Sequence, residues 1–386
     1  MTLKLAAVAV AVFIVGCSKL SSVKVARSYD PAFFTSGGTE LVPPSDKLSS
    51  SCASDADFDA CIVYKNPVAQ KQASAGPGEL TALLHYGVKL RGLNHSDGLE
   101  NRYFKILSLH TPHFSLSHPD QRKGGYSESQ SYVEQVTAYY WANRTFEYLT
   151  ARLGEERLPV KGLTIYPDDG FTGFSASGHS ISLAKKPGEV SKALSGEIVV
   201  QLLGQALAYQ LSGEKSFDLH NLVQHKTCDL NPKGCCSSEL GCAGALNGAF
   251  GDYLAGIMFP ESPKLGETAG QSVAGQNICG LDRDLAKLSV KSRSAIYAAC
   301  TGASAGKIAL EGAWYASLWW KFRTRAEELE SGASRDADIL FFEHARAWTA
   351  TSTFIEAKKA SLAQAATYKG GKYAALLESV FTAAGL

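Results

Sequence analysis

The sequence predicts an α+β fold, in which a mixed region of strands and helices is followed by a mainly helical region. Short runs that alternate apolar and polar residues occur early, at 86–90 and 103–107, as in half-buried strands. The stretch 131–149 then places apolar residues at helical spacing. From about residue 289 onward, most segments have helical periodicity.

The remaining elements follow from the same patterns. Strands are expected at 163–166 and 180–183, with a turn at Asp168-Asp169-Gly170 between them. Residues 18 to about 75 are rich in Ser, Ala, Gly and Pro, which indicates a tether with a small loop. The expected helices are 191–211, which begins near Ser195, and 243–257, 295–299, 307–330, 338–350, 354–367 and 373–384.

Composition limits the classes of function. The 386 residues are 45% apolar and 19% charged, which suits one large domain or two ordinary ones. Lys and Arg total 38 and Asp and Glu total 37, so the basic surplus typical of nucleic-acid-binding proteins is missing. We therefore expect no nucleic-acid partner.

The N-terminus predicts export. Lys4 precedes an apolar run at 6–15 that is too short to span a bilayer, as in a signal peptide. The run ends in Gly16-Cys17, which resembles a bacterial lipobox and implies that residues 1–17 are a signal peptide ending at a lipidated Cys17. Several acyl chains would anchor the protein to a membrane. Ser18, by resemblance to enterobacterial sorting, favours the outer membrane, facing the periplasm or the surface. The alternative is an ordinary signal peptide with an incidental cysteine.

The other cysteines suggest disulfide bonds, because an even number in an exported chain is typical of them. Cys52 and Cys61 are expected to pair across a short loop. Lys215 to Cys242 reads as an irregular insertion. The remaining candidates are Cys228, Cys235, Cys236, Cys242, Cys279 and Cys300, and the sequence does not choose among their pairings.

Two apolar helices in the middle of the chain carry a family resemblance. The first contains Val199-Val200-Gln-Leu-Leu-Gly-Gln205, and the second contains Asn247-Gly-Ala-Phe-Gly-Asp252. They resemble the thermolysin and fungalysin families of zinc metallopeptidases, whose helices carry H-E-x-x-H and N-E-x-x-S-D. The segments 138–144, 171–174, 291–297 and 314–386 resemble the same families, in the same order. The resemblance covers about 127–386 and implies a two-lobed fold, with an N-terminal lobe at 127–215 and a helical C-terminal lobe at 216–386 that includes the cysteine-rich insertion. It does not explain residues 18–126, which are expected to be a tether and a small strand-rich region.

The chemistry of those families needs residues that this chain lacks. Two His at i and i+4 bind zinc, a neighbouring Glu is the general base, and a carboxylate from the second helix is the third ligand. By this resemblance Gln201 and Gln205 stand at the His positions, Leu202 at the base and Gly248 at the third ligand. A glutamine offers a neutral oxygen, which zinc rarely selects. We therefore expect no catalytic zinc and no cofactor.

Two further positions complete the comparison. Lys291 stands where the families have a histidine that stabilises the oxyanion. Asp252 is retained and lies one helical turn after Gly248, on the same face. In the families this Asp orients the first zinc-binding His, so here we expect it to accept a hydrogen bond from the amide of Gln201.

The resemblance thus implies an inactive, peptidase-like envelope lipoprotein that retains a cleft. By this interpretation the cleft binds a peptide or protein partner by strand addition along 172–175, with Thr172 and Phe174 lining it. Three alternatives stay open: an ordinary core helix with two accidental glutamines, an envelope scaffold, and a hydrolase with another nucleophile. The chain has no G-x-S-x-G motif that would support the hydrolase alternative. A zinc site at His220, His225 and Cys228 is less favoured than a disulfide at Cys228.

Overall fold

The computed structural model describes residues 59–64, 85–94, 98–117, 132–158, 162–177, 179–185, 191–214, 242–259, 264–265, 283–289 and 304–386. The chain divides into two compact units, Met1–Gly37 and Gly38–Leu386, and every described residue belongs to the second. The described part is an α+β structure, as the sequence predicts. The predicted signal peptide and Cys17 lie outside the described residues, and the predicted lobe boundary near residue 215 stays a prediction.

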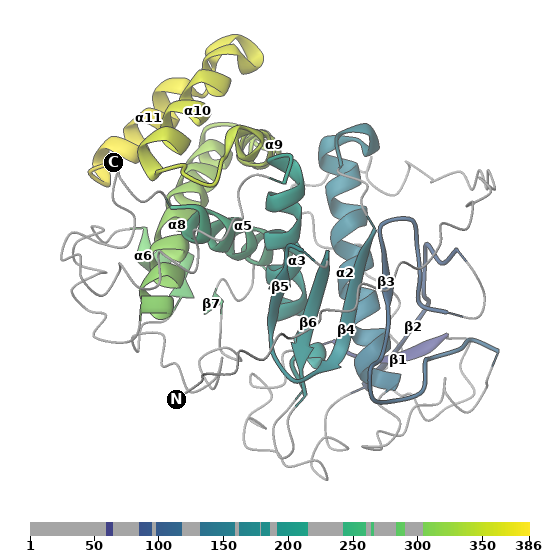
Figure 1. Cartoon of the computed structure of the whole chain (residues 1–386). Coiled ribbons are helices and arrows are strands. Elements are labelled where there is room, and N and C mark those ends of the chain that lie inside the picture. The colour runs from purple at the N-terminus through teal and green to yellow at the C-terminus, as the bar shows by residue number, and fades with distance from the viewer. Residues whose placement is uncertain are drawn as a thin grey trace, which may run out of the picture. The chain divides into compact units, whose positions relative to one another are not determined.

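The main described sheet has four strands in the order β3-β4-β6-β5 (Figure 1). Strands β3, β4 and β6 run parallel to one another, and β5 pairs with β6 in the antiparallel sense, so β5 forms one edge. All five residues of β6 are buried, as expected for an interior strand of a covered sheet. The strands are β3 (Phe104–Ile106), β4 (Leu163–Asp169), β5 (Gly173–Ser175) and β6 (Ser180–Ala184).

The turn predicted at Asp168 begins later, because β4 continues to Asp169, which pairs with Ala184. Asp168 is buried, and its carboxylate accepts hydrogen bonds from the hydroxyl of Ser108 and the backbone N–H of Leu109, at 2.5 and 2.8 Å. Burial alone would raise the pKa of Asp168, but these hydrogen bonds outweigh it and hold the pKa below its ordinary value. The side chain thus fixes the loop that follows β3.

Two short strand pairs lie outside the main sheet. Strand β1 (Ala60–Val63) pairs antiparallel with β2 (His85–Val88), and β7 (Lys264–Leu265) pairs with β8 (Arg283–Asp284). Residues 60–63 were expected to be part of a loop, and this prediction is wrong. All four side chains are buried, and the N–H of Val63 donates to Thr137 Oγ1 at 3.1 Å, so β1 packs on the helix that carries Thr137.

Most predicted helices are present near their expected bounds. The helix expected at 338–350 is shifted, because it begins at Ser334 and ends at His344. The next helix begins at Phe354 as predicted, because Thr353 and Glu356 form a capping box. The described α-helices are α2 (Tyr132–Leu153), α3 (Gly196–Leu211), α5 (Ala243–Met258), α6 (Leu285–Leu288), α8 (Ser304–Leu329), α9 (Ser334–His344), α10 (Phe354–Thr367) and α11 (Ala374–Ala383). The described 3-10 turns are η3 (Glu155–Arg157), η4 (Lys192–Leu194), η6 (Ala345–Ala347) and η7 (Tyr368–Gly371).

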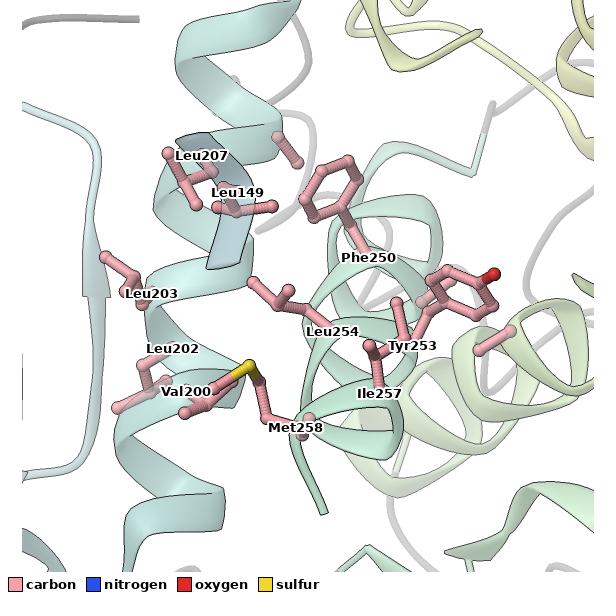
Figure 2. Close-up of a cluster of buried hydrophobic side chains, with 14 of the residues drawn as sticks. Leu149, Val200, Leu202, Leu203, Leu207, Phe250, Tyr253, Leu254, Ile257 and Met258 are labelled. Carbon is pink, nitrogen blue, oxygen red and sulfur yellow. The ribbon is translucent and has the colours of Figure 1, made fainter. Parts of the chain in front are cut away.

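Helices α3, α5 and α8 pack in that order, with α5 in the middle. The contacts are close enough to require glycine. A Cβ on Gly251 of α5 would lie 2.3 Å from the carbonyl oxygen of Gln201, and a Cβ on Gly312 of α8 would lie 2.6 Å from that of Ala245. Leu254 and Met258 of α5 point toward α3 and fill the rest of that contact (Figure 2). Within the described residues, no helix is both long and apolar enough to cross a membrane.

A buried ionic cluster joins four helices. Asp338 of α9 is fully buried and accepts hydrogen bonds from the hydroxyls of Tyr148 (α2) and Tyr253 (α5), at 2.7 and 2.8 Å. Arg323 of α8 donates to the same carboxylate at 3.1 Å. Burial, reinforced by the negative charge of Asp338, raises the pKa of both tyrosines, so they remain hydrogen-bond donors. This cluster thereby fixes the positions of α2, α5, α8 and α9 relative to one another.

Candidate functional site

Helix α3 leaves one stripe of its surface accessible. Its three residues that are not buried are Gln201, Gln205 and Tyr209, spaced four apart, so they follow one another along one face. Gln201 and Gln205, which stand at the zinc-binding His positions by the resemblance, are therefore both accessible on this helix.

Helix α5 shows the same arrangement. Gly244 and Gly248 are its two residues that are not buried. A Cβ built on Gly248 meets no described atom within 4 Å, so a side chain would fit there. Gly248 is thus an accessible position, unlike Gly251 three residues later, which touches α3.

The predicted bond between the two helices is present. Gln201 Nε2 donates to Asp252 Oδ1 at 2.6 Å, and Asp252 is fully buried. A buried carboxylate needs such donors, because its unpaired form costs free energy in an apolar interior. The amide of Gln201 supplies a donor to Asp252, in line with the prediction from the resemblance, and it ties α3 to α5 beside the Gly251 contact.

Leu202 belongs to the hydrophobic core. It is 5% exposed and lies among the buried side chains drawn in Figure 2. Its side chain has no atom that accepts or delivers a proton, so this position contributes packing. Lys291, the other position predicted from the resemblance, lies outside the described residues.

The edge strand β5 packs against α3. The ring of Phe174 is 5.7 Å from that of Tyr209, centroid to centroid. The structure thus brings Phe174 next to the α3 stripe. Thr172 has a framework role, because its hydroxyl oxygen accepts a hydrogen bond from the N–H of Ala184 at 3.1 Å and fixes the start of β5.

Two residues at the end of this stripe were not predicted. His179 lies between β5 and β6, and its Nε2 is 4.0 Å from Glu214 Oε1 beyond the end of α3. Both residues have positive φ, at 44° and 66°, which is rare for non-glycine residues and is frequent at functional sites. The His179 ring also lies 6.2 Å from that of Tyr209. No sequence motif marks this pair, because 35 residues separate its members along the chain (214 − 179).

One cysteine prediction is corrected. Cys242 is a free, buried thiol and does not take part in a disulfide. It directly precedes α5, and its N–H donates to the carbonyl of Ser352, so it packs inside the helical region. Cys61 is disulfide-bonded. The other candidates, Cys52, Cys228, Cys235, Cys236, Cys279 and Cys300, lie outside the described residues, and so do His220 and His225.

Over the described ranges, no group of three or more His, Cys, Asp or Glu side chains is arranged to hold a metal ion. The α3 stripe itself presents two amide groups and one phenol ring, and such groups suit hydrogen bonding and stacking.

No family model matches the chain, and no curated protein matches it. Among solved structures, it is similar to the precursor of protealysin, a metalloproteinase from Serratia proteamaculans. The two are 15% identical with a TM-score of 0.46, over 83% of this chain and 98% of that chain. An identity of 15% and a TM-score of 0.46 do not show that the two proteins share an activity.

Proposed function

We propose that this protein is a catalytically inactive, peptidase-like binding protein. Its ligand is an extended peptide or protein segment that lies along β5 and the stripe of α3. The observation that carries the proposal is the packing of the edge strand β5 on α3, with Phe174 against Tyr209. Tyr209 follows Gln201 and Gln205 on the one accessible face of α3. The resembled families keep zinc ligands at the positions of Gln201, Gln205 and Gly248, and a general base at that of Leu202. In this chain none of these four residues is suited to bind zinc or to move a proton.

The mode of binding follows from the strand edge. An edge strand offers backbone N–H and C=O groups to an added strand, and alternate side chains of the added strand contact the surface beneath. The aromatic rings of Phe174 and Tyr209 supply apolar contact area at that edge. Such a site needs no metal, because backbone hydrogen bonds and ring contacts hold the ligand.

The binding mode is testable with fluorescein-labelled casein, an unfolded protein that offers many extended segments. We expect the purified protein to raise its fluorescence anisotropy without releasing fragments. Replacing Phe174 and Tyr209 together with alanine should weaken binding about tenfold, which corresponds to about 1.4 kcal/mol of lost ring contact.

The matched control is Ile355→Ala, which removes an apolar side chain of α10 that is 53% exposed and distant from β5 in the chain. It should bind casein like the unmodified protein. Zinc-dependent fragment release that a chelator abolishes would refute the inactive assignment. Unchanged binding by the double variant would refute the site and favour a scaffold whose other surfaces carry the function.

We also propose that the chain is an envelope lipoprotein anchored through Cys17, which rests on the apolar run and Gly16-Cys17 of the sequence. In a bacterial host, Cys17→Ala should move the protein from the membrane fraction to the soluble fraction and abolish labelling with radioactive palmitate, because no acyl chain can then attach. Cys242→Ala is the control, since Cys242 is a buried free thiol and should leave the fractionation unchanged. Membrane retention of the Cys17 variant would contradict the anchor.

A further inference from the structure

The side-chain amide of Gln201 is held in one orientation. Its Nε2 donates to Asp252 Oδ1 at 2.6 Å, and a carboxylate accepts this hydrogen bond but has no hydrogen of its own to give. The nitrogen therefore faces α5, and the oxygen of the same amide is turned away from Asp252. Gln201 is partly exposed, and its Oε1 is not a buried atom and accepts no hydrogen bond from any residue that the structure describes. This position thus presents a hydrogen-bond acceptor that a ligand can reach.

Gln205 offers a second amide one helical turn later. It is also partly exposed, and its side chain makes no hydrogen bond with any residue in the described ranges. Unlike the amide of Gln201, this amide can turn either its N–H groups or its oxygen toward a ligand. The stripe therefore combines one fixed acceptor with one amide that both donates and accepts.

The stripe has no charged residue, because its third member is Tyr209. A carboxylate on a ligand would place its oxygens against Gln201 Oε1, so that one acceptor faces another. An ammonium or guanidinium group can donate to Oε1, but it would lose hydration without meeting an opposite charge on the stripe. A primary amide is neutral, donates through its –NH2 group and accepts through its oxygen. The side chains that match these two positions are therefore those of Asn and Gln.

The spacing of the stripe matches an extended chain. Its residues are four apart, which in an α-helix is a rise of about 6 Å. Alternate residues of an extended strand point to the same face and lie about 6.6 Å apart. A strand that lies along α3 thus places every second side chain opposite the next residue of the stripe. Gly248, one turn before Asp252 on α5, is accessible, and a Cβ added there would meet no described atom within 4 Å, so it leaves room for such a side chain.

We propose that the α3 stripe selects segments with amide side chains. A bound segment places Asn or Gln opposite Gln201 and opposite Gln205, and an aromatic side chain two residues further on, against Tyr209 and Phe174. The first ligand amide donates to Gln201 Oε1, and the second pairs with the amide of Gln205. This inference rests on the proposed function, because it names the side chains that the strand-addition site recognises.

The probe is the fluorescein-labelled peptide Phe-Ser-Gln-Ser-Gln-Ser-Phe, which reads the same in both chain directions. Three matched probes replace both Gln with Glu, Lys or Met, and fluorescence anisotropy of the purified protein measures binding. We expect the Gln probe to bind about tenfold more tightly than the Glu and Met probes, because Glu has no N–H donor and Met has no amide. The Lys probe should also bind more weakly than the Gln probe.

Two variants assign the preference to the stripe. Gln205→Met should lower the preference for the Gln probe over the Met probe about threefold, since one of the two amide contacts is lost. Asp252→Asn allows the amide of Gln201 to turn its N–H groups outward, so the discrimination between the Gln and Glu probes should shrink. Gln364→Met, the same exchange on α10, is the control and should bind every probe like wild type. Circular dichroism checks the folding of the Asp252 variant, and the accessible Gln205 position gives a test that does not depend on it.

The outcomes separate this inference from the proposed function. Equal binding of the Gln and Met probes, tighter binding of the Glu or Lys probe, or a Gln205→Met variant that keeps the full preference would overturn the amide selection. If the same protein still raises the anisotropy of casein, strand addition stands without that selection. A Gln preference that depends on Gln205 in a protein that does not bind casein would support the stripe and count against strand addition to unfolded chains in general.

Discussion

Replacing Gly251 with alanine is expected to lower the free energy of unfolding by about 3 kcal/mol, the upper part of the range for overpacked sites. The added Cβ would lie 2.3 Å from the carbonyl oxygen of Gln201, an atom of the α3 backbone that no rotamer change can move. The two helices must therefore separate. Gly204 of α3 is equally restricted to glycine, because a Cβ added there would lie 2.6 Å from the Cα of Gly251. Urea unfolding followed by circular dichroism measures the change.

The control lies on the same helix. Gly248→Ala adds the same methyl group three residues earlier, where it meets no described atom within 4 Å. Alanine favours helix over glycine by about 1 kcal/mol, so this variant should be slightly more stable than wild type. Equal effects of the two substitutions would show that α3 and α5 do not approach each other as the structure describes. The Gly251 variant should also weaken the Gln201–Asp252 hydrogen bond, because this bond spans α3 and α5 and lengthens when the two helices move apart.

Acid is expected to destabilise the protein through His344, which is fully buried in α9. Its Nδ1–H donates to the carbonyl of Phe341, and its Nε2 accepts from the hydroxyl of Tyr315 at 3.2 Å, so the neutral ring is satisfied. Its ring also stacks on Trp319, with centroids 4.7 Å apart. Burial lowers the pKa of His344 from 6.5 to about 3.

The direction of the effect follows from proton binding. Between pH 6.5 and about 3 the unfolded chain binds a proton at His344 and the folded chain does not. The stabilisation is therefore complete above the unfolded pKa of 6.5 and is lost as the pH falls toward the folded value. The free energy of unfolding should fall by up to about 1.4 kcal/mol for each pH unit in this window.

The measurement compares urea unfolding of wild type and His344→Gln at pH 7 and pH 5. Glutamine keeps hydrogen-bonding groups but does not titrate. The variant should be less stable at pH 7, yet it should lose about 2 kcal/mol less than wild type between the two pH values. Identical slopes for wild type and His344→Gln would contradict a buried neutral histidine.

Local pattern was enough to predict most helices. Helices α2, α5 and α10 lie where apolar periodicity places them, and a capping box also marks the start of α10, because such signals act within a few turns. Strand β1 was missed, because Ala60 to Val63 is a run of four residues whose partner, β2, lies about 25 residues further along. Such a short run reads as a strand only when its partner and the covering helix are known.

What the sequence alone determined is which residues stand at positions 201, 202, 205 and 248, and the order of most of the α+β elements. Gln201, Leu202, Gln205 and Gly248 lack the groups that bind zinc or move a proton, and folding cannot supply them. The tertiary structure decided which residues meet. The His179–Glu214 pair and the Asp338 cluster each join elements that are distant along the chain. Their geometry depends on how helices and strands pack, and this packing cannot be read from the apolar pattern of the sequence around each residue.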